Sequence, residues 1–161
     1  MDSNVFLVPC DPGNFDQTVG STIDLTDYSD HPPALSGMNE VRLWGAREGS
    51  KNQQYFESMV AGDLLLFYQE GNYVGTGRVG TTFTDEEGWV STTFWDGAPA
   101  YFIYTVADFI PVVVPKSAVN RLFDYNTEYN PEGLIPVADH RLGEHPEAIE
   151  LAVQRYSQKH G

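Results

Sequence analysis

Basic and aromatic side chains gather in one short stretch of this chain, around Trp44. The polar members of the stretch are, in order, Arg42, Arg47, Lys51 and Asn52. Three of the nine basic residues of the whole chain therefore lie within ten positions. Arginine and lysine contact phosphates and fix the register of a nucleic acid, while an aromatic ring can stack on a base. The pattern predicts phosphate contacts beside a base-stacking tryptophan, and the alternative is that the basic residues pair with nearby acids.

Two further tryptophans, Trp89 and Trp95, lie in a stretch that is otherwise rich in Asp, Glu, Gly, Ser and Thr. A single tryptophan most often packs in a core. Trp44, however, alternates with the apolar Val41 and Leu43 and is expected on the opposite face of their strand. We therefore expect Trp44 and Trp95 to face each other across a slot that holds a flat ligand.

The sequence lacks the usual patterns of catalytic and metal sites. No acidic residue stands two positions before a lysine, as metal-dependent nucleases require, and the chain has no Gly-x-Ser-x-Gly, Walker or Gly-x-Gly-x-x-Gly motif. The histidines are not spaced as zinc ligands; they are His31, His140, His145 and His160. Cys10 is the only cysteine and is expected to be a buried, inert thiol. We predict a binding protein rather than an enzyme, with no metal and no cofactor.

The chain is strongly acidic, with 23 acids against nine bases and a formal net charge of -14. An acidic surface adapted to high salt, repulsion from nucleic acid and a cationic partner are the three explanations. We favour the first, a halophilic source, because the acids are scattered along the chain rather than gathered in a tail. No apolar run approaches the roughly 18 residues of a membrane span, and no basic, then apolar, leader opens the sequence. These features predict a soluble, cytoplasmic protein.

Short strands separated by Gly and Pro, with a few helices, predict an α+β fold. Strands are expected at Asn4–Val8, Val41–Ala46, Leu64–Tyr68, Tyr73–Val79, Tyr101–Val106 and Phe109–Val114. Helices are expected at Gln54–Val60, at Pro115–Phe123 and from Pro146 onward, and residues 11–40 are expected to be irregular, with at most one turn at Phe15–Val19. Gly75 and Gly77 predict a bend or a close backbone approach.

The order of these elements resembles the EVE and YTH domains of the PUA-like superfamily over about residues 4–115. Three stretches carry the resemblance: Asn4–Asp11, Val41–Arg47, and Val60–Tyr68 with Tyr73–Val79. It implies a small twisted β-barrel of about five to six strands flanked by helices. We expect the barrel domain at residues 1–123, and the tail at 124–161, which lies outside the part shared with the family, to be a C-terminal extension with a closing helix packed on the same domain. The long insertion at residues 20–38 and the thin basic surface depart from the family.

The same resemblance implies a binding pocket for one flipped, modified base. Trp44 and Trp95 would be the cage walls, with Trp89 as the substitute for Trp95. Gly45 would supply a backbone contact, and Asp11 or Asn14 a polar contact to the base edge. We expect 6-methyladenine in DNA and a specificity module of a modification-dependent restriction system, fused to or acting with a nuclease or ATPase. The alternatives are a PUA-like RNA-binding protein and a protein-interaction domain.

Overall fold

The computed structural model describes residues 4–160 of the 161-residue chain. Its strands are β1 (Val5–Pro9), β2 (Ile23–Asp24), β3 (Glu40–Val41), β4 (Leu43–Arg47), β5 (Leu64–Gln69), β6 (Asn72–Thr84), β7 (Ala100–Pro115) and β8 (Ile135–Pro136). Its helices are α1 (Pro12–Thr18), α2 (Ser50–Glu57), α3 (Trp89–Phe94), α4 (Lys116–Leu122) and α5 (Pro146–His160). Short 3-10 turns occupy Leu25–Asp27, Pro33–Leu35 and Asp139–Arg141.

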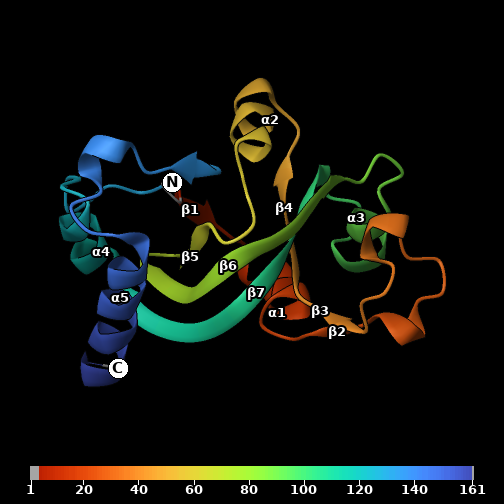
Figure 1. Cartoon of the computed structure of the whole chain (residues 1–161), viewed down its shortest axis with the longest axis horizontal. Helices are drawn as coiled ribbons and strands as arrows, with labels where there is room; N and C mark the ends of the chain where they lie inside the picture. Colours follow the sequence, from red (N-terminus) through yellow and green to blue (C-terminus); the bar gives the residue numbers. More distant parts are fainter. Residues whose placement is uncertain (1–3, 161) are drawn as a thin grey trace.

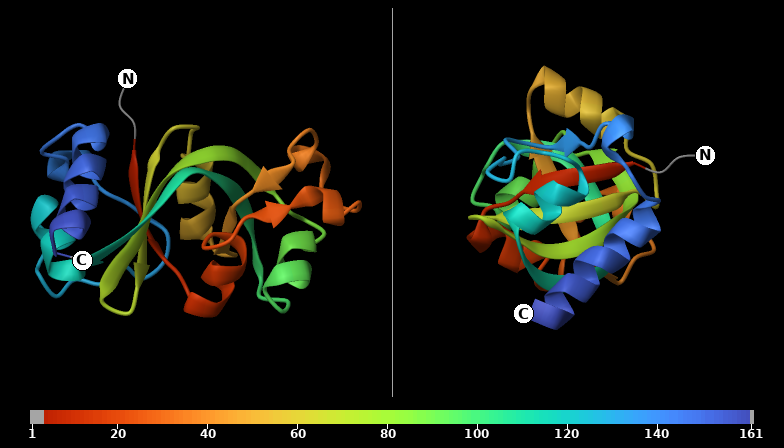
Figure 2. Two further views of the ribbon diagram at one scale, coloured as in Figure 1. Left: turned by 90° about the horizontal axis from the view of Figure 1, so that it is seen from below. Right: turned by 90° about the vertical axis from the view of Figure 1, so that its left-hand side faces the viewer.

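Six strands form one curled sheet in the order β4, β7, β6, β5, β1, β8, while β2 and β3 form a separate ribbon. β1 runs parallel to β5, and its other neighbour, β8, is antiparallel. β6 and β7 curve across the molecule, from α4 and α5 at one end to α3 at the other (Figure 1; Figure 2). The predicted α+β fold, with a small twisted β-barrel of about five to six strands flanked by helices, is confirmed in the form of a half-barrel: the six-stranded sheet is curled, and its edge strands β4 and β8 do not pair with each other.

Glycines allow β6 to curve against β7. The register between the two strands shifts at several points along their length, and such bulges bend a strand. A Cβ on Gly77 would lie 2.6 Å from Cγ1 of Val106, and one on Gly75 would overlap the ring of Phe109. Of the two alternatives predicted at Gly75 and Gly77, the register shifts support the bend, and the nearest atoms to both glycines are side-chain atoms of β7.

The sheet separates two apolar cores. Phe6 and Val8 of β1 pack into a first core with α1, β4 and α3, whereas Val5 and Leu7 pack into a second core with α4 and α5. Because successive side chains of a strand point to opposite faces, β1 must be apolar throughout. This is the reason for the continuous apolar run at the start of the sequence.

Several segments are more regular than expected. α1 is a seven-residue helix where one turn was predicted, because Asp11 caps its N-terminus and Pro12 fits its first turn. α3 occupies part of the stretch that was expected to be a loop, after a left-handed Gly88. β7 is one continuous strand instead of two, with Pro111 at a register shift against Gly75. The prediction that the last helix begins at Pro146 is confirmed.

Residues after 123 contact the rest of the sheet. β8 pairs with β1, and Val137, Ile149 and Val153 are buried in the second core. The division into a barrel at 1–123 and an extension at 124–161 stays a prediction, as does the cytoplasmic location. Within residues 4–160, every helix is too short or too polar to cross a membrane.

Candidate functional site

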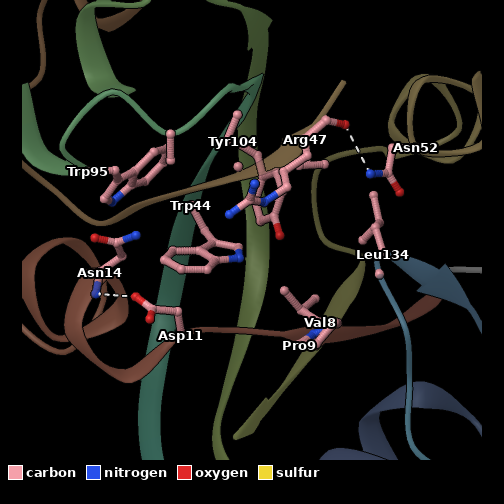
Figure 3. Close-up of a pocket in the computed structure, with 15 residues that line it drawn as sticks. Val8, Pro9, Asp11, Asn14, Trp44, Arg47, Asn52, Trp95, Tyr104 and Leu134 are labelled. Atoms are coloured by element: carbon pink, nitrogen blue, oxygen red, sulfur yellow. Dashed lines mark hydrogen bonds between the residues drawn. The ribbon is translucent and has the colours of Figure 1, made fainter. Parts of the chain in front are cut away.

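A pocket of about 210 Å³ opens at the end of β1, between β4, β7, α1 and the loop that precedes β8 (Figure 3). Its apolar lining consists of Val8, Pro9, Ala46, Ala98, Ala100 and Leu134, with Gly45 and Gly133. Its polar and aromatic lining consists of Asp11, Asn14, Trp44, Arg47, Asn52, Trp95 and Tyr104. The pocket thus brings together seven of the ten residues proposed from the sequence to contact base or phosphate, Gly45 among them.

The two tryptophans touch each other. Trp44 and Trp95 have ring centroids 5.4 Å apart at an interplanar angle of 65°, an edge-to-face contact. The expectation of two rings facing each other across a slot is wrong for this structure, because rings in direct contact leave no room for a base between them. Trp44 is 8 % exposed and belongs to the first core, against the expectation that it lies opposite the apolar face. The open space lies beside Trp44 rather than between the two indoles.

Trp95 is held in place from two sides. Its Nε1 donates to the hydroxyl of Thr18 at 3.3 Å, and its ring packs over Gly45. A Cβ on Gly45 would lie 3.2 Å from Cζ3 of Trp95 and 2.8 Å from Cδ1 of Ile103. The packing of β4 against Trp95 and Ile103 therefore requires glycine at position 45, independently of the backbone contact to a ligand that the sequence predicted there.

Replacing Gly45 with alanine is expected to destabilise the protein by about 1–3 kcal/mol, because the added methyl group overpacks the core. The matched control is Gly13→Ala in α1, where the nearest atom to an added Cβ is a side-chain oxygen at 3.8 Å. Urea denaturation of both variants measures the difference. Unchanged stability of the Gly45 variant would contradict the packing described for Trp95.

Asp11 and Asn14 lie at the start of α1, on one side of the pocket (Figure 3). The Oδ2 atom of Asp11 accepts a hydrogen bond of 2.8 Å from the backbone N–H of Asn14, which is a helix N-cap. Among the described residues, no side-chain hydrogen bond is formed by the amide of Asn14. The amide of Asn14 and the second oxygen of Asp11 are thus placed to contact a ligand.

Of the four predicted phosphate contacts, two line the pocket, Arg47 and Asn52, and two do not, Arg42 and Lys51. Arg47 is exposed at the pocket, and its carbonyl accepts a 2.9 Å hydrogen bond from Nδ2 of Asn52. Within residues 4–160 neither Arg47 nor Lys51 forms an ion pair. Lys51 is exposed on α2 outside the pocket lining. Arg42 lies elsewhere, with its guanidinium 4.9 Å from the ring centroid of Phe109 and donating to the carbonyl of Val19.

Trp89 is not at this pocket. Its ring makes edge-to-face contacts with Tyr28, at 5.9 Å, and Phe94, at 5.5 Å, and it borders a separate hollow lined by acids such as Glu86 and Glu87. The structure therefore does not place Trp89 where the proposed substitute for Trp95 would stand.

Several pocket residues escaped sequence reasoning. Tyr104 is one of many aromatic residues in a strand and carries no motif, and Leu134 comes from a loop of the C-terminal extension. Residues 103–106 of β7 are all buried, so no alternation singles out Tyr104, and its position at the pocket depends on the pairing of β7 with β4. The side chain of Tyr104 is buried, and this burial raises the pKa of its hydroxyl well above 10.

Cys10 follows β1 next to the pocket, and its thiol donates to the carbonyl of Tyr68 at 3.3 Å. Burial, more than the nearby Asp11 and Asp16 carboxylates, raises the pKa of the thiol to about 12. The reactive thiolate is therefore scarce at pH 8. We expect alkylation of native Cys10 to be at least about 100-fold slower than in the urea-denatured chain at pH 8, as measured by the rate of iodoacetamide labelling. Equal rates in the two states would contradict the inert thiol predicted from the sequence.

No family model and no curated protein matches this sequence. Three solved structures are similar. The N-terminal domain of Thermococcus gammatolerans McrB bound to m5C DNA is 15 % identical, with a TM-score of 0.72 over 94 % of this chain and 99 % of that chain. A hypothetical protein from Leishmania major is 16 % identical, with a TM-score of 0.54 over 98 % of both chains. A YTH domain of Zygosaccharomyces rouxii MRB1 protein in complex with N6-methyladenosine RNA is 12 % identical, with a TM-score of 0.49 over 97 % of this chain and 85 % of that chain.

At these identities the comparisons establish the fold. The McrB N-terminal domain matches almost the whole of this chain, so the two share a fold.

Proposed function

We propose that this protein is a reader domain that binds one modified base, flipped out of DNA, in the pocket beside Trp44. The observation that carries the proposal is the pocket itself, which combines an indole, apolar walls and free polar groups at one opening. A protein that shares the fold, the McrB N-terminal domain, is described as bound to m5C DNA.

The size and lining of the pocket suit a single base. Its volume of about 210 Å³ is below that of pockets for drug-sized ligands, roughly 300–1,000 Å³. Val8, Pro9 and Leu134 offer apolar contacts to a methyl group, each buried carbon of which contributes about 0.8 kcal/mol. Arg47, exposed and without an acidic partner among the described residues, is placed to contact the backbone next to the flipped nucleotide.

Two modified bases are candidates. The sequence favoured 6-methyladenine in DNA, whereas the McrB domain, which has the highest TM-score of the three structures, is described as bound to m5C DNA. Recognition of DNA rather than RNA, and the role of specificity module beside a nuclease or ATPase in a restriction system, are parts of the same proposal. The interaction-domain alternative expects Trp44 to be buried and Arg47 to be paired with an acid. Trp44 is buried, as that alternative expects, but a pocket opens beside it, and within residues 4–160 Arg47 forms no ion pair.

The test is a binding screen of one duplex in four forms, in which a central base is unmodified cytosine, 5-methylcytosine, unmodified adenine or 6-methyladenine. A single-stranded RNA carrying N6-methyladenosine is the fifth ligand. The proposal expects one modified duplex to bind more tightly than its unmodified partner and than the RNA. Equal binding of modified and unmodified duplexes would overturn it, and tighter binding of the RNA would favour the RNA-binding alternative.

The acidic surface predicts a weak dependence of this binding on salt. The affinity of a protein for duplex DNA falls with a log–log slope of about 0.9 per phosphate contact. Arg47 lines the pocket and Lys51 lies on α2, and within residues 4–160 neither forms an ion pair. We expect a slope of about −1 to −2 and a loss of less than about threefold for Lys51→Ala. Titration from low to molar salt measures both, and the same series followed by circular dichroism tests the predicted halophilic stability. A slope as steep as −5 would show that phosphate contacts dominate.

A further inference from the structure

The floor of the pocket holds two polar groups that the proposed function has not used. Tyr104 of β7 and Trp44 of β4 are direct partners in the antiparallel pairing of these strands. Directly opposed residues of an antiparallel pair place their side chains side by side on one face. In Figure 3 the Tyr104 side chain and the indole nitrogen of Trp44 both point toward the space bounded by Val8 and Leu134.

Both groups are almost fully buried and lack a partner. Tyr104 is 1 % exposed and Trp44 is 8 % exposed. Among residues 4–160 no hydrogen bond is formed by the Tyr104 hydroxyl or by Nε1 of Trp44, whereas Nε1 of Trp95 is bonded to Thr18. Neither polar atom is fully enclosed, unlike the Tyr73 hydroxyl, so both are open to the pocket, where the acceptors of a ligand can replace water.

The chemistry of the two groups defines the edge they can bind. An indole N–H only donates, and the Tyr104 hydroxyl keeps its proton because burial raises its pKa well above 10. Cytosine has two adjacent acceptors, N3 and O2, on its Watson–Crick edge. Adenine has one acceptor there, N1, and beside it the amino group that carries the methyl in 6-methyladenine. Two neighbouring donors therefore match cytosine better than adenine.

We propose that Tyr104 is the specificity-determining residue of this pocket: its hydroxyl and the Nε1–H of Trp44 hydrogen-bond to N3 and O2 of a flipped cytosine. The inference rests on the proposed function and adds the identity of the base, a 5-substituted cytosine. Trp44 then meets the edge of the base with its N–H, which lies in the plane of the indole ring, instead of stacking on the base. The methyl group at C5 lies on the opposite edge of the ring and is sensed by other residues.

The variant that tests the proposal is Tyr104→Phe, which removes one oxygen and keeps the ring. The hydroxyl has no partner in the folded chain, so the variant is expected to fold like the wild type. The matched control is Tyr73→Phe, since Tyr73 is also fully buried with an unpartnered hydroxyl but lies in the second core, away from the pocket. Thermal unfolding of both variants confirms that they are folded at the temperature of the binding assay.

Duplexes with a central cytosine, 5-methylcytosine or 6-methyladenine are the probes. Wild-type protein should bind the 5-methylcytosine duplex more tightly than the 6-methyladenine duplex. Tyr104→Phe should weaken binding of the cytosine and 5-methylcytosine duplexes by the same factor, about fivefold, because one neutral hydrogen bond is lost. The ratio between these two duplexes should stay unchanged, since the methyl group is on the other edge, and Tyr73→Phe should bind as the wild type.

The outcomes separate the inference from the function on which it rests. If the wild type binds no modified duplex more tightly than its unmodified form, the proposed function fails. If it does, but Tyr104→Phe and Tyr73→Phe bind alike, the role of Tyr104 is overturned. A loss of discrimination between methylated and unmethylated cytosine in Tyr104→Phe would show that the residue only supports the shape of the pocket. Tighter binding of the 6-methyladenine duplex by the wild type would overturn the assignment to cytosine.

Discussion

Trp44→Ala is expected to weaken binding of the preferred modified duplex by at least about fivefold, because the indole N–H and the apolar surface beside the base are both lost. Trp44 borders the pocket, and among the described residues its Nε1 has no hydrogen-bond partner. Its loss removes a wall and a donor at once. The affinity is measured by fluorescence anisotropy, at a salt concentration where the titration of the duplex with wild-type protein reaches saturation.

The same variant is expected to be less stable, because Trp44 packs against Phe15, at 6.1 Å, and Trp95 in the first core. Truncating such a ring costs about 3–5 kcal/mol. Trp89→Ala is the matched control, since it also removes an indole from an aromatic cluster, with Tyr28 and Phe94, but lies away from the pocket. Among folded molecules Trp89→Ala should bind as the wild type. Equal losses in the two variants would show that the site is not beside Trp44.

The fold could be predicted from the sequence where one residue type determines local structure. The apolar run of β1, the glycines of β6 and Pro146 at the start of α5 each indicate their element without tertiary information. α3 could not be predicted, because Trp89–Phe94 has no apolar stripe of helical length and its helix depends on burial of Val90 and Phe94. The break between β3 and β4 also depends on tertiary contacts, because Arg42 turns toward Val19 and Phe109.

The site was predictable in its composition and not in its geometry. Trp44, Trp95, Asp11 and Arg47 line one pocket, as their types suggested, but the relation between the indoles follows from Gly45, which lets Trp95 approach β4 closely enough to touch Trp44. Strand alternation alone placed Trp44 opposite the apolar face. The structure buries it instead, because α1 and α3 cover that face of β4 and provide Phe15 and Trp95 as neighbours.

The high acidity and the pocket fit together in physical terms. With few free cations near the opening, counterion release contributes little to binding, so discrimination between DNA sequences must come from groups inside the pocket. Salt weakens the interactions of buried donors, such as the Tyr104 hydroxyl, far less than it weakens those of surface charges. A reader built in this way keeps its selectivity in a salt concentration that would weaken a basic protein.

Phe123→Ala is expected to reduce the free energy of unfolding by about 3–5 kcal/mol and to leave the binding of folded molecules unchanged. Phe123 ends α4, is fully buried in the second core, and makes an edge-to-face contact with Tyr125 at 6.2 Å. The neighbouring Leu122→Ala is the control, because Leu122 is 41 % exposed and its truncation should change stability by no more than about 0.5 kcal/mol. A shift of the urea midpoint without a change in slope measures the loss.

The position of Phe123 makes this variant a test of how the two cores are coupled. It stands at the boundary between the proposed barrel, 1–123, and the proposed extension, 124–161, and residues of both parts, Leu7 and Ile149 among them, are buried in the same second core. Leu134 of the extension lines the pocket on the other face of the sheet. If folded molecules of Phe123→Ala bind more weakly than folded wild type, the second core helps the extension to position Leu134. If binding is unchanged, as we expect, the sheet keeps the pocket independent of the core behind it.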